Sequence, residues 1–150
     1  MAAYKTIVVG TDGSDSSFRA VDRAAAIAAD TGATLVIASA YHPSRPEDVA
    51  RLQDQLGADV AYQVVGSSPA EEAVRTAAER ARSAGAQTID TTVVDGEPVP
   101  TLVRLVREHA ADLLVVGNRG LNTLAGRILG SVPAEAARKA GVDVLVVHTT

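Results

Sequence analysis

The sequence predicts an α/β fold in which an open, parallel sheet carries helices on both faces. Short apolar runs typical of strands alternate with helical patterns along all 150 residues, as in consecutive βαβ units. Small aliphatic residues supply nearly all of the apolar content, with one Phe, three Tyr and no Trp. Ala and Val suit helices that lie close to strands buried on both faces. The length fits a single domain, which we expect to span residues 1–150.

The first unit is a buried strand followed by an amphipathic helix. Thr6–Val9 forms the strand, and Gly10 ends it. Ser14 is a good N-cap for the helix, and Gly32 suits its left-handed C′ position. Apolar residues recur every three or four positions between these two signals, which predicts a face turned toward the sheet. That face carries Phe18, Val21, Ala25 and Ala28.

A long connection separates the second strand from the second helix. The strand spans Thr34–Tyr41, and the helix begins near Pro69 and ends before Gly85. Prolines, glycines and charged residues are mixed through His42–Ser68, where Arg51–Leu56 has the pattern of a short helix. A connection this long is usually functional or mobile, so we assign it no structure.

The remaining elements follow in order, and most carry a start or stop signal. Pro98 suits the first turn of a helix, and Gly141 ends the last one. The strands are Thr88–Val94, Leu113–Val116 and Val144–Val147, and the helices begin at Glu97–Pro98 and run from about Ser131 to Ala140. The prediction is therefore five strands and four helices.

Composition argues against several classes of partner. The formal net charge is −4 and there is no block of Lys or Arg, which disfavours nucleic acid and anionic membrane surfaces. No apolar run approaches the ~20 residues that span a bilayer. The absence of cysteine excludes disulfides, thiolate chemistry and Cys-type zinc sites. A strand begins within a few residues of the N-terminus, so we expect no signal peptide and a cytoplasmic protein.

A glycine pattern after the fourth strand is typical of a phosphate site. Gly117-Asn118-Arg119-Gly120 follows that strand, and Gly130-Ser131 leads into a helix. Backbone N–H groups and the helix dipole attract an anion at such a place, and glycines let its oxygens approach the main chain. An ordinary loop would explain any one of these glycines. Four glycines within fourteen residues, ending in Ser at a helix start, favour phosphate binding.

A carboxylate follows the first strand. Asp12 lies in Gly10-Thr11-Asp12-Gly13-Ser14, and ligands of open parallel sheets bind outside the carboxyl ends of the strands. If the first and fourth strands are neighbours, Asp12 and the glycine pattern flank one crevice. A carboxylate there suits a ribose diol or a magnesium ion that accompanies phosphates. The alternative is a turn in which Asp12 bonds its own backbone.

These residues resemble the one-domain members of the universal stress protein family, along the whole chain. The opening Val8–Ser14 and the closing Val144–Val147 match the family. Between them lies its ATP signature of glycine, two residues, glycine, nine residues, glycine and Ser or Thr, which is filled by Gly117, Gly120, Gly130 and Ser131. The resemblance implies the sheet order 3-2-1-4-5 of the adenine nucleotide alpha hydrolase-like fold. It also implies homodimers, with ATP bound between the first and fourth strands.

The resemblance also implies roles for single residues. Asp12 would hold the ribose, and the backbone of Ala40 would meet adenine. Gly10 and Thr11 would line the pocket floor, with Val116 near the nucleoside. The phosphates would be held by Gly117, Gly120, Gly130, Ser131 and Val132. ATP, with or without Mg²⁺, is the expected ligand, and cyclic AMP, which some actinobacterial relatives prefer, stays open.

Three functions are compatible with the sequence. The first is a nucleotide-binding sensor or regulator. The second is an enzyme acting on ATP, because Thr11–Ser16 partly resembles the Ser-Gly-Gly-x-Asp-Ser loop of ATP pyrophosphatases. Asp12 stands where that loop needs Gly. The sequence also lacks the P-loop Lys that binds phosphate, and no general base can be named. We therefore expect slow ATP hydrolysis at most. The third is a dimer that binds no ligand and uses its glycines as turns.

The last strand predicts a homodimer. Val144–His148 is apolar, contains neither Pro nor Lys, and is expected at an edge of the sheet. A two-fold copy pairing antiparallel with it would satisfy the free backbone groups, with Val144, Val146 and Val147 in the interface. In the alternative, a monomer covers this edge with its own His42–Ser68 segment.

Overall fold

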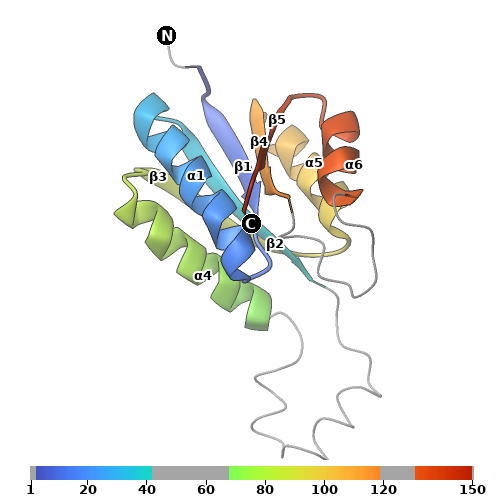
Figure 1. Cartoon of the computed structure of the whole chain (residues 1–150), viewed down its shortest axis with the longest axis horizontal. Coiled ribbons are helices and arrows are strands. Elements are labelled where there is room, and N and C mark those ends of the chain that lie inside the picture. Colours follow the sequence, from blue (N-terminus) through green and yellow to red (C-terminus); the bar gives the residue numbers. More distant parts are fainter. Residues whose placement is uncertain (1–2, 42–67, 119–130, 150) are drawn as a thin grey trace, which may run out of the picture.

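The strands form one parallel sheet in the order β3-β2-β1-β4-β5. The computed structural model describes residues 3–41, 68–118 and 131–149 (Figure 1). The strands are β1 (Thr6–Gly10), β2 (Thr34–Tyr41), β3 (Thr88–Asp95), β4 (Leu113–Gly117) and β5 (Asp143–Val147). This arrangement confirms the predicted fold class and the strand order that the family resemblance implied.

Helices cover both faces of this sheet. Those described are α1 (Asp15–Thr31), α4 (Ser68–Ser83), α5 (Pro98–Glu108) and α6 (Ser131–Lys139). Helices α1 and α4 lie on one face, and α5 and α6 lie on the other (Figure 1). Each begins close to its predicted start, and α1, α4 and α6 also end close to their predicted ends. Arg51–Leu56, the part of the long connection whose pattern suits a short helix, lies outside the described residues.

The local signals at the ends of α1 act as expected. The Ser14 hydroxyl accepts the N–H of Ser17 at 3.1 Å, which satisfies one of the free donors of the first turn. Gly32 adopts φ 74° at the C-cap and donates its N–H to the Ala28 carbonyl. A residue with a Cβ is strained at that angle, whereas glycine ends the helix without this strain.

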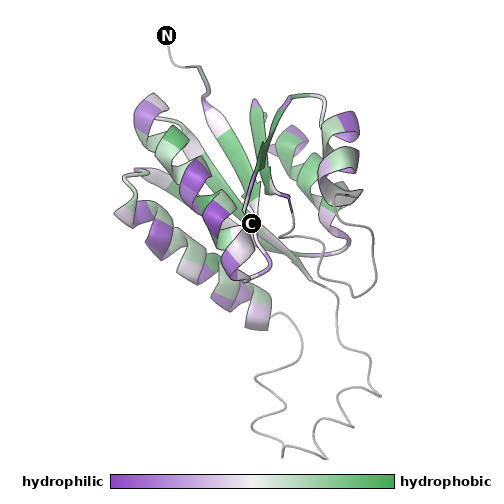
Figure 2. Ribbon diagram, in the orientation of Figure 1, coloured by the Kyte–Doolittle hydropathy of each residue, from purple (hydrophilic) through white to green (hydrophobic). Residues whose placement is uncertain are grey.

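Side chains along each strand point alternately to the two faces of the sheet, and this divides the core into two layers. Ile7 and Val9 pack on the side of α1 and α4, whereas Val8 packs on the side of α5 and α6. All three are fully buried, because β1 has helices on both faces. Figure 2 shows the hydrophobic strands between helices whose hydrophilic residues face outward. No described helix combines the length and the apolar character needed to cross a membrane.

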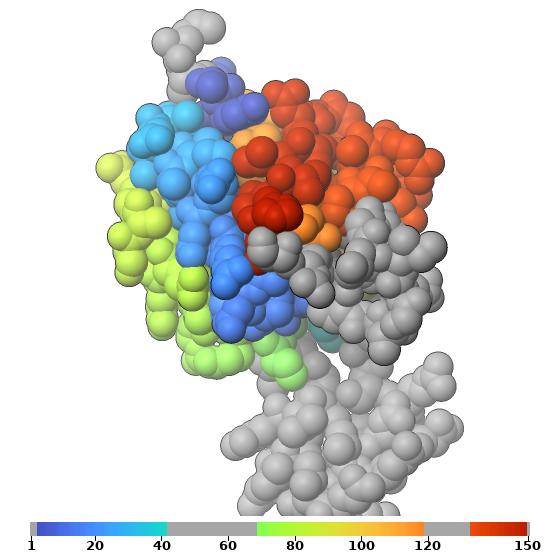
Figure 3. Space-filling view, viewed as in Figure 1, coloured from blue at the N-terminus to red at the C-terminus, as the bar shows by residue number. Residues whose placement is uncertain are grey.

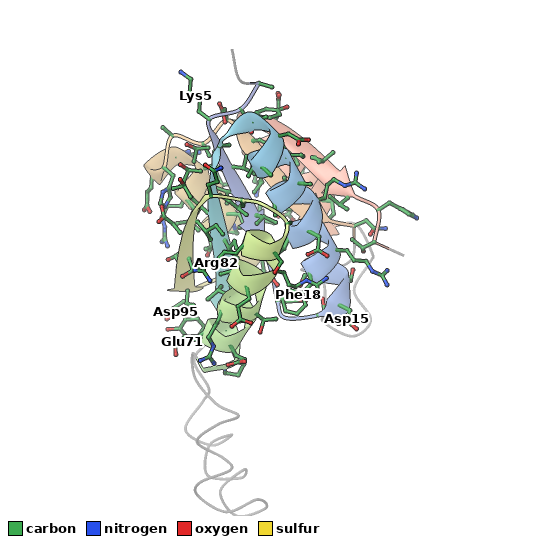
Figure 4. All side chains as sticks on the ribbon, turned by 90° about the vertical axis from the view of Figure 1, so that its left-hand side faces the viewer. Lys5, Asp15, Phe18, Glu71, Arg82 and Asp95 are labelled. Atoms are coloured by element: carbon green, nitrogen blue, oxygen red, sulfur yellow. The ribbon has the colours of Figure 1, made fainter. Side chains whose placement is uncertain are left out.

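The amino ends of β1 and β4 are joined by one aspartate. The Asp112 carboxylate accepts the backbone N–H groups of Lys5 and Thr6 at 3.0–3.1 Å, and the Asp112 N–H donates to the Thr6 carbonyl. Two parallel strands aligned at their starts place their carboxyl ends together at the opposite end of the sheet. Figure 4 shows this polarity, with Lys5 at one end of the molecule and Asp15 at the other.

The packing of α1 gives a first prediction. Ala24 is fully buried between α1 and the sheet, so leucine there adds volume that the core cannot accept without strain. We expect Ala24→Leu to lower the free energy of unfolding by about 2 kcal/mol in urea titrations. Ala26→Leu, at an exposed position of the same helix, is the control and should change it by less than about 0.5 kcal/mol. Equal effects of the two variants would contradict this account of the packing.

Candidate functional site

A crevice is expected at the carboxyl ends of β1 and β4, where the strand order reverses. Strand β1 pairs with β2 on one side and with β4 on the other. The chain leaves β1 for α1 on one face, and the helix that follows β4, α6, lies on the opposite face (Figure 1). The helices that follow β1 and β4 therefore lie on opposite faces, and ligands of open α/β sheets bind at such a point.

A buried hydroxyl network shapes the connection from β1 to α1. Thr11 is fully buried, and its hydroxyl lies 2.7 Å from that of Ser17, which is 1% exposed. The Thr11 hydroxyl also accepts the N–H of Gly13 at 3.1 Å. The Ser17 hydroxyl donates to the Ser14 carbonyl at 2.9 Å and accepts the N–H of Asp12 at 3.3 Å. Side-chain oxygens thus hold both ends of this turn in one geometry.

Beside this network, the two oxygens of the Asp12 carboxylate have different surroundings. Its Oδ1 accepts the Ser14 N–H at 2.9 Å, the self-bonding turn that the sequence offered as the alternative reading. Its Oδ2 is buried and has no hydrogen-bond partner among the described residues. A buried carboxylate oxygen without a donor costs free energy, so such an atom indicates a place where a ligand supplies the donor. The turn and ligand roles are therefore compatible, one for each oxygen.

The strand residues expected around a nucleoside contribute mostly backbone. Gly10 and Gly117 end β1 and β4, and both are buried. Ala40 is half-buried near the end of β2, opposite Val94 of β3. Val116 is 0% exposed, and its side chain packs in the core on the side of α5 and α6. A ligand at the crevice would meet the main chain of Val116.

The predicted phosphate residues fall partly outside the described chain. Gly120 and Gly130 lie in the undescribed stretch 119–130. Ser131 is the first residue of α6 and Val132 is the second, so the predicted Gly-Ser helix start is confirmed as a helix start. The backbone N–H of Asn118 donates to the Val147 carbonyl at 3.0 Å and is therefore not free to bind phosphate.

Sequence reasoning missed three polar residues of this region. Ser17 completes the hydroxyl network, and the Asn118 side chain accepts two hydrogen bonds from Thr149, which is 2% exposed. A signal for Ser17 existed, since a buried helix face rarely carries Ser without a partner. No local pattern links Asn118 to a residue 31 positions away.

A second hollow lies away from these residues. It is a groove of about 550 Å³ between α4 and β3, lined among others by Val74, Arg75, Arg82, Thr91 and Val93. Strand β3 is separated from β1 by β2. The groove is therefore distinct from the β1–β4 crevice.

Comparison with known proteins identifies the family of this chain. The model of the universal stress protein family matches residues 3–148. The chain belongs to the universal stress protein family. This confirms the resemblance on which the strand order and the site residues were predicted.

Individual universal stress proteins are similar over the whole chain. Rv1636 of Mycobacterium tuberculosis (strain H37Rv) is 57% identical over 150 residues, which is 100% of both sequences. A universal stress protein crystallised in complex with cAMP is 49% identical, with a TM-score of 0.76 and 100% of both chains covered. Universal stress protein UspA from Lactobacillus plantarum is 26% identical, with a TM-score of 0.74, covering 99% of this chain and 100% of that one.

The hydroxyl network gives the second prediction. Ser17→Ala leaves the Thr11 hydroxyl and the Asp12 N–H of this universal stress protein without their partner. We expect a loss of about 1–2 kcal/mol in the free energy of unfolding, because unpaired buried groups outweigh the better helix propensity of Ala. Ser83→Ala, at an exposed position of α4, is the control and should stay within about 0.5 kcal/mol of the wild type. A Ser17→Ala variant as stable as this control would mean that the network contributes nothing.

Proposed function

We propose that this universal stress protein is a regulatory homodimer that binds an adenine nucleotide at the carboxyl ends of β1 and β4. ATP, with or without Mg²⁺, and cyclic AMP are the candidate ligands. The role is binding, with slow hydrolysis of ATP at most. Asp12 would hold the ribose, and Gly117, Gly120, Gly130, Ser131 and Val132 would hold the phosphates. The backbones of Gly10, Thr11, Ala40 and Val116 would border the nucleoside.

The Asp12 carboxylate is the observation that carries the proposal. Its Oδ2 is buried and has no donor in the described part of the chain, just beyond the end of the strand next to β4. A ribose hydroxyl is a donor of suitable size, and a hydrogen bond to a carboxylate is about twice as strong as one between neutral groups. Helix α6 begins beyond the neighbouring strand, and its N-terminus suits the negative phosphates. One ligand carrying both a ribose and a phosphate would donate a hydrogen bond to Asp12 Oδ2 and place negative charge near the N-terminus of α6.

The relative crystallised in complex with cAMP supports the ligand class. It is 49% identical to this chain over the full length of both. Cyclic AMP and ATP share adenine and ribose but differ in the number of phosphates and in the free 3′-hydroxyl. Isothermal titration with each, with and without Mg²⁺, is the experiment that ranks them. Absence of heat with both nucleotides would overturn the proposal.

The edge position of β5 supports the proposed homodimer. Among the described strands β5 is an edge strand that pairs with β4 alone, and Val146 is 43% exposed. Residues 42–67, part of the segment that the alternative places over this edge, lie outside the described chain. Val147, which the sequence placed in the interface, is 6% exposed and packs in the core beside α1. Alternation along the strand turns it inward, so we remove its side chain from the proposed interface. The backbone edge, the half-buried Val144 and the exposed Val146 remain in the proposed interface.

The role of Asp12 gives the third prediction. Asp12→Asn keeps the Oδ1 that accepts from Ser14 but replaces the charged Oδ2 by an amide. We expect the dissociation constant of the nucleotide to rise about tenfold or more in calorimetric titrations, since a charge-assisted hydrogen bond is lost.

Deoxynucleotides are the control for this variant. The 2′- or 3′-deoxy analogue should bind the wild type more weakly than the ribonucleotide and should lose little further affinity in Asp12→Asn, because both changes remove the same hydrogen bond. If both deoxy analogues bind the wild type as tightly as the ribonucleotide, Asp12 does not hold the ribose.

The exposed edge gives the fourth prediction. We expect light scattering at micromolar concentration to give twice the 15.4 kDa chain mass. Val146→Lys should shift the protein toward the monomer with an unchanged circular dichroism spectrum, because a lysine on an edge strand opposes pairing. Thr91→Lys places the same charge at an exposed position of β3, the other edge strand, and should leave the dimer intact. A monomeric wild type would rule out this interface.

A further inference from the structure

A polar cluster ties the two walls of the proposed crevice together. It consists of Ser16 and Arg19 in the first two turns of α1, Asn118 directly after β4, and Thr149 beyond β5. Figure 3 shows the dark red end of the described chain lying against the blue surface of α1. Thr149 is 2% exposed, which is unusual for a threonine two residues past an edge strand.

Thr149 holds the Asn118 side chain twice. Its backbone N–H donates to Asn118 Oδ1 at 2.9 Å, and its hydroxyl donates to the same oxygen at 2.7 Å. A backbone N–H can only donate, so the side-chain atom it meets is the amide oxygen. The Asn118 N–H donates in turn to the Val147 carbonyl. Asn118 is thereby fixed through both its main chain and its side chain.

Thr149 also holds the start of α1. The hydroxyls of Ser16 and Thr149 are hydrogen-bonded, and the Arg19 guanidinium donates to the Thr149 carbonyl. The single hydroxyl proton of Thr149 is already given to Asn118, so Ser16 is the donor. A continuous chain of hydrogen bonds therefore runs from Ser16 through Thr149 to Asn118.

This chain connects the two sides of the site. Ser16 follows the turn that carries Asp12, and Asn118 follows Gly117. We infer that Thr149 is a positioning residue that sets the spacing between the Asp12 turn and the exit of β4. The inference rests on the proposed function, because that spacing matters only for a ligand that reaches both sides.

The binding affinities of a nucleotide and of adenosine should depend differently on this spacing. The nucleotide would contact Asp12 through its ribose and the side of β4 and the start of α6 through its phosphate, whereas adenosine lacks the phosphate. Breaking the chain of hydrogen bonds through Thr149 should therefore weaken nucleotide binding and leave adenosine binding unchanged. A general loss of protein stability would weaken the binding of both ligands alike.

The test uses Thr149→Val, which keeps the shape of the side chain and removes its hydroxyl. The probes are adenosine and whichever of ATP and cyclic AMP binds the wild type more tightly. We expect the dissociation constant of the nucleotide to rise about three- to tenfold, as for the loss of one or two hydrogen bonds, and that of adenosine to change less than about twofold. Thr149→Ser restores the hydroxyl and should restore nucleotide affinity.

Further variants separate positioning from folding. Ser16→Ala removes only the hydroxyl contact between α1 and Thr149, leaves the Arg19 contact in place, and should also weaken nucleotide binding. The double variant should bind the nucleotide no more weakly than Thr149→Val alone, because both changes break the same chain of hydrogen bonds. Thr31→Val removes a hydroxyl that donates to the Ile27 carbonyl at the far end of α1, and should leave both ligands unaffected. If Thr149→Val does not fold, Ser16→Ala carries the test.

The results distinguish a failure of the proposed function from a failure of the positioning role. Wild-type protein that binds neither ATP nor cyclic AMP refutes the proposed function before any variant is made. Wild-type protein that binds, with Thr149→Val or Ser16→Ala leaving nucleotide affinity unchanged or lowering nucleotide and adenosine affinity equally, refutes the positioning role alone.

Discussion

Strand β1 is hydrogen-bonded to β2 on one side and to β4 on the other, and the rest of the structure depends on that position. Because both faces of β1 are fully buried, helices must cover both sides of the sheet. The strand order reverses next to β1, and the helices that follow β1 and β4 lie on opposite faces of the sheet. The carboxyl ends of β1 and β4 therefore lie side by side where these two helices separate, and Asp12 follows β1 at this place.

Most of the fold could be predicted because its signals are local. The apolar runs of the strands, the Ser14 N-cap and the C-cap at Gly32 each act within a few residues. Strand order is different, since periodicity does not say which strands pair. It came from the family resemblance, and Asp112 now supplies a physical part of the reason by holding the start of β1 against that of β4.

The candidate site could be predicted only in part, for a related reason. The place of Asp12 after β1 was visible in the sequence, but the separate states of its two oxygens depend on Ser14 and on burial. The contact between Thr149 and Asn118 joins two residues 31 positions apart that no local pattern relates. Val147 was assigned to the wrong environment because its inward orientation follows from the pleat and the register with β4.

The two edges of the sheet differ in a way that limits growth. Strand β5 exposes Val146, whereas β3 carries the exposed carboxylates of Asp90 and Asp95. In the proposed homodimer the two β5 edges pair with each other, and β3 is the remaining edge among the described strands. Further copies arriving there would bring aspartates against aspartates, which opposes pairing. Such an assembly ends as a closed pair and does not extend into a fibre.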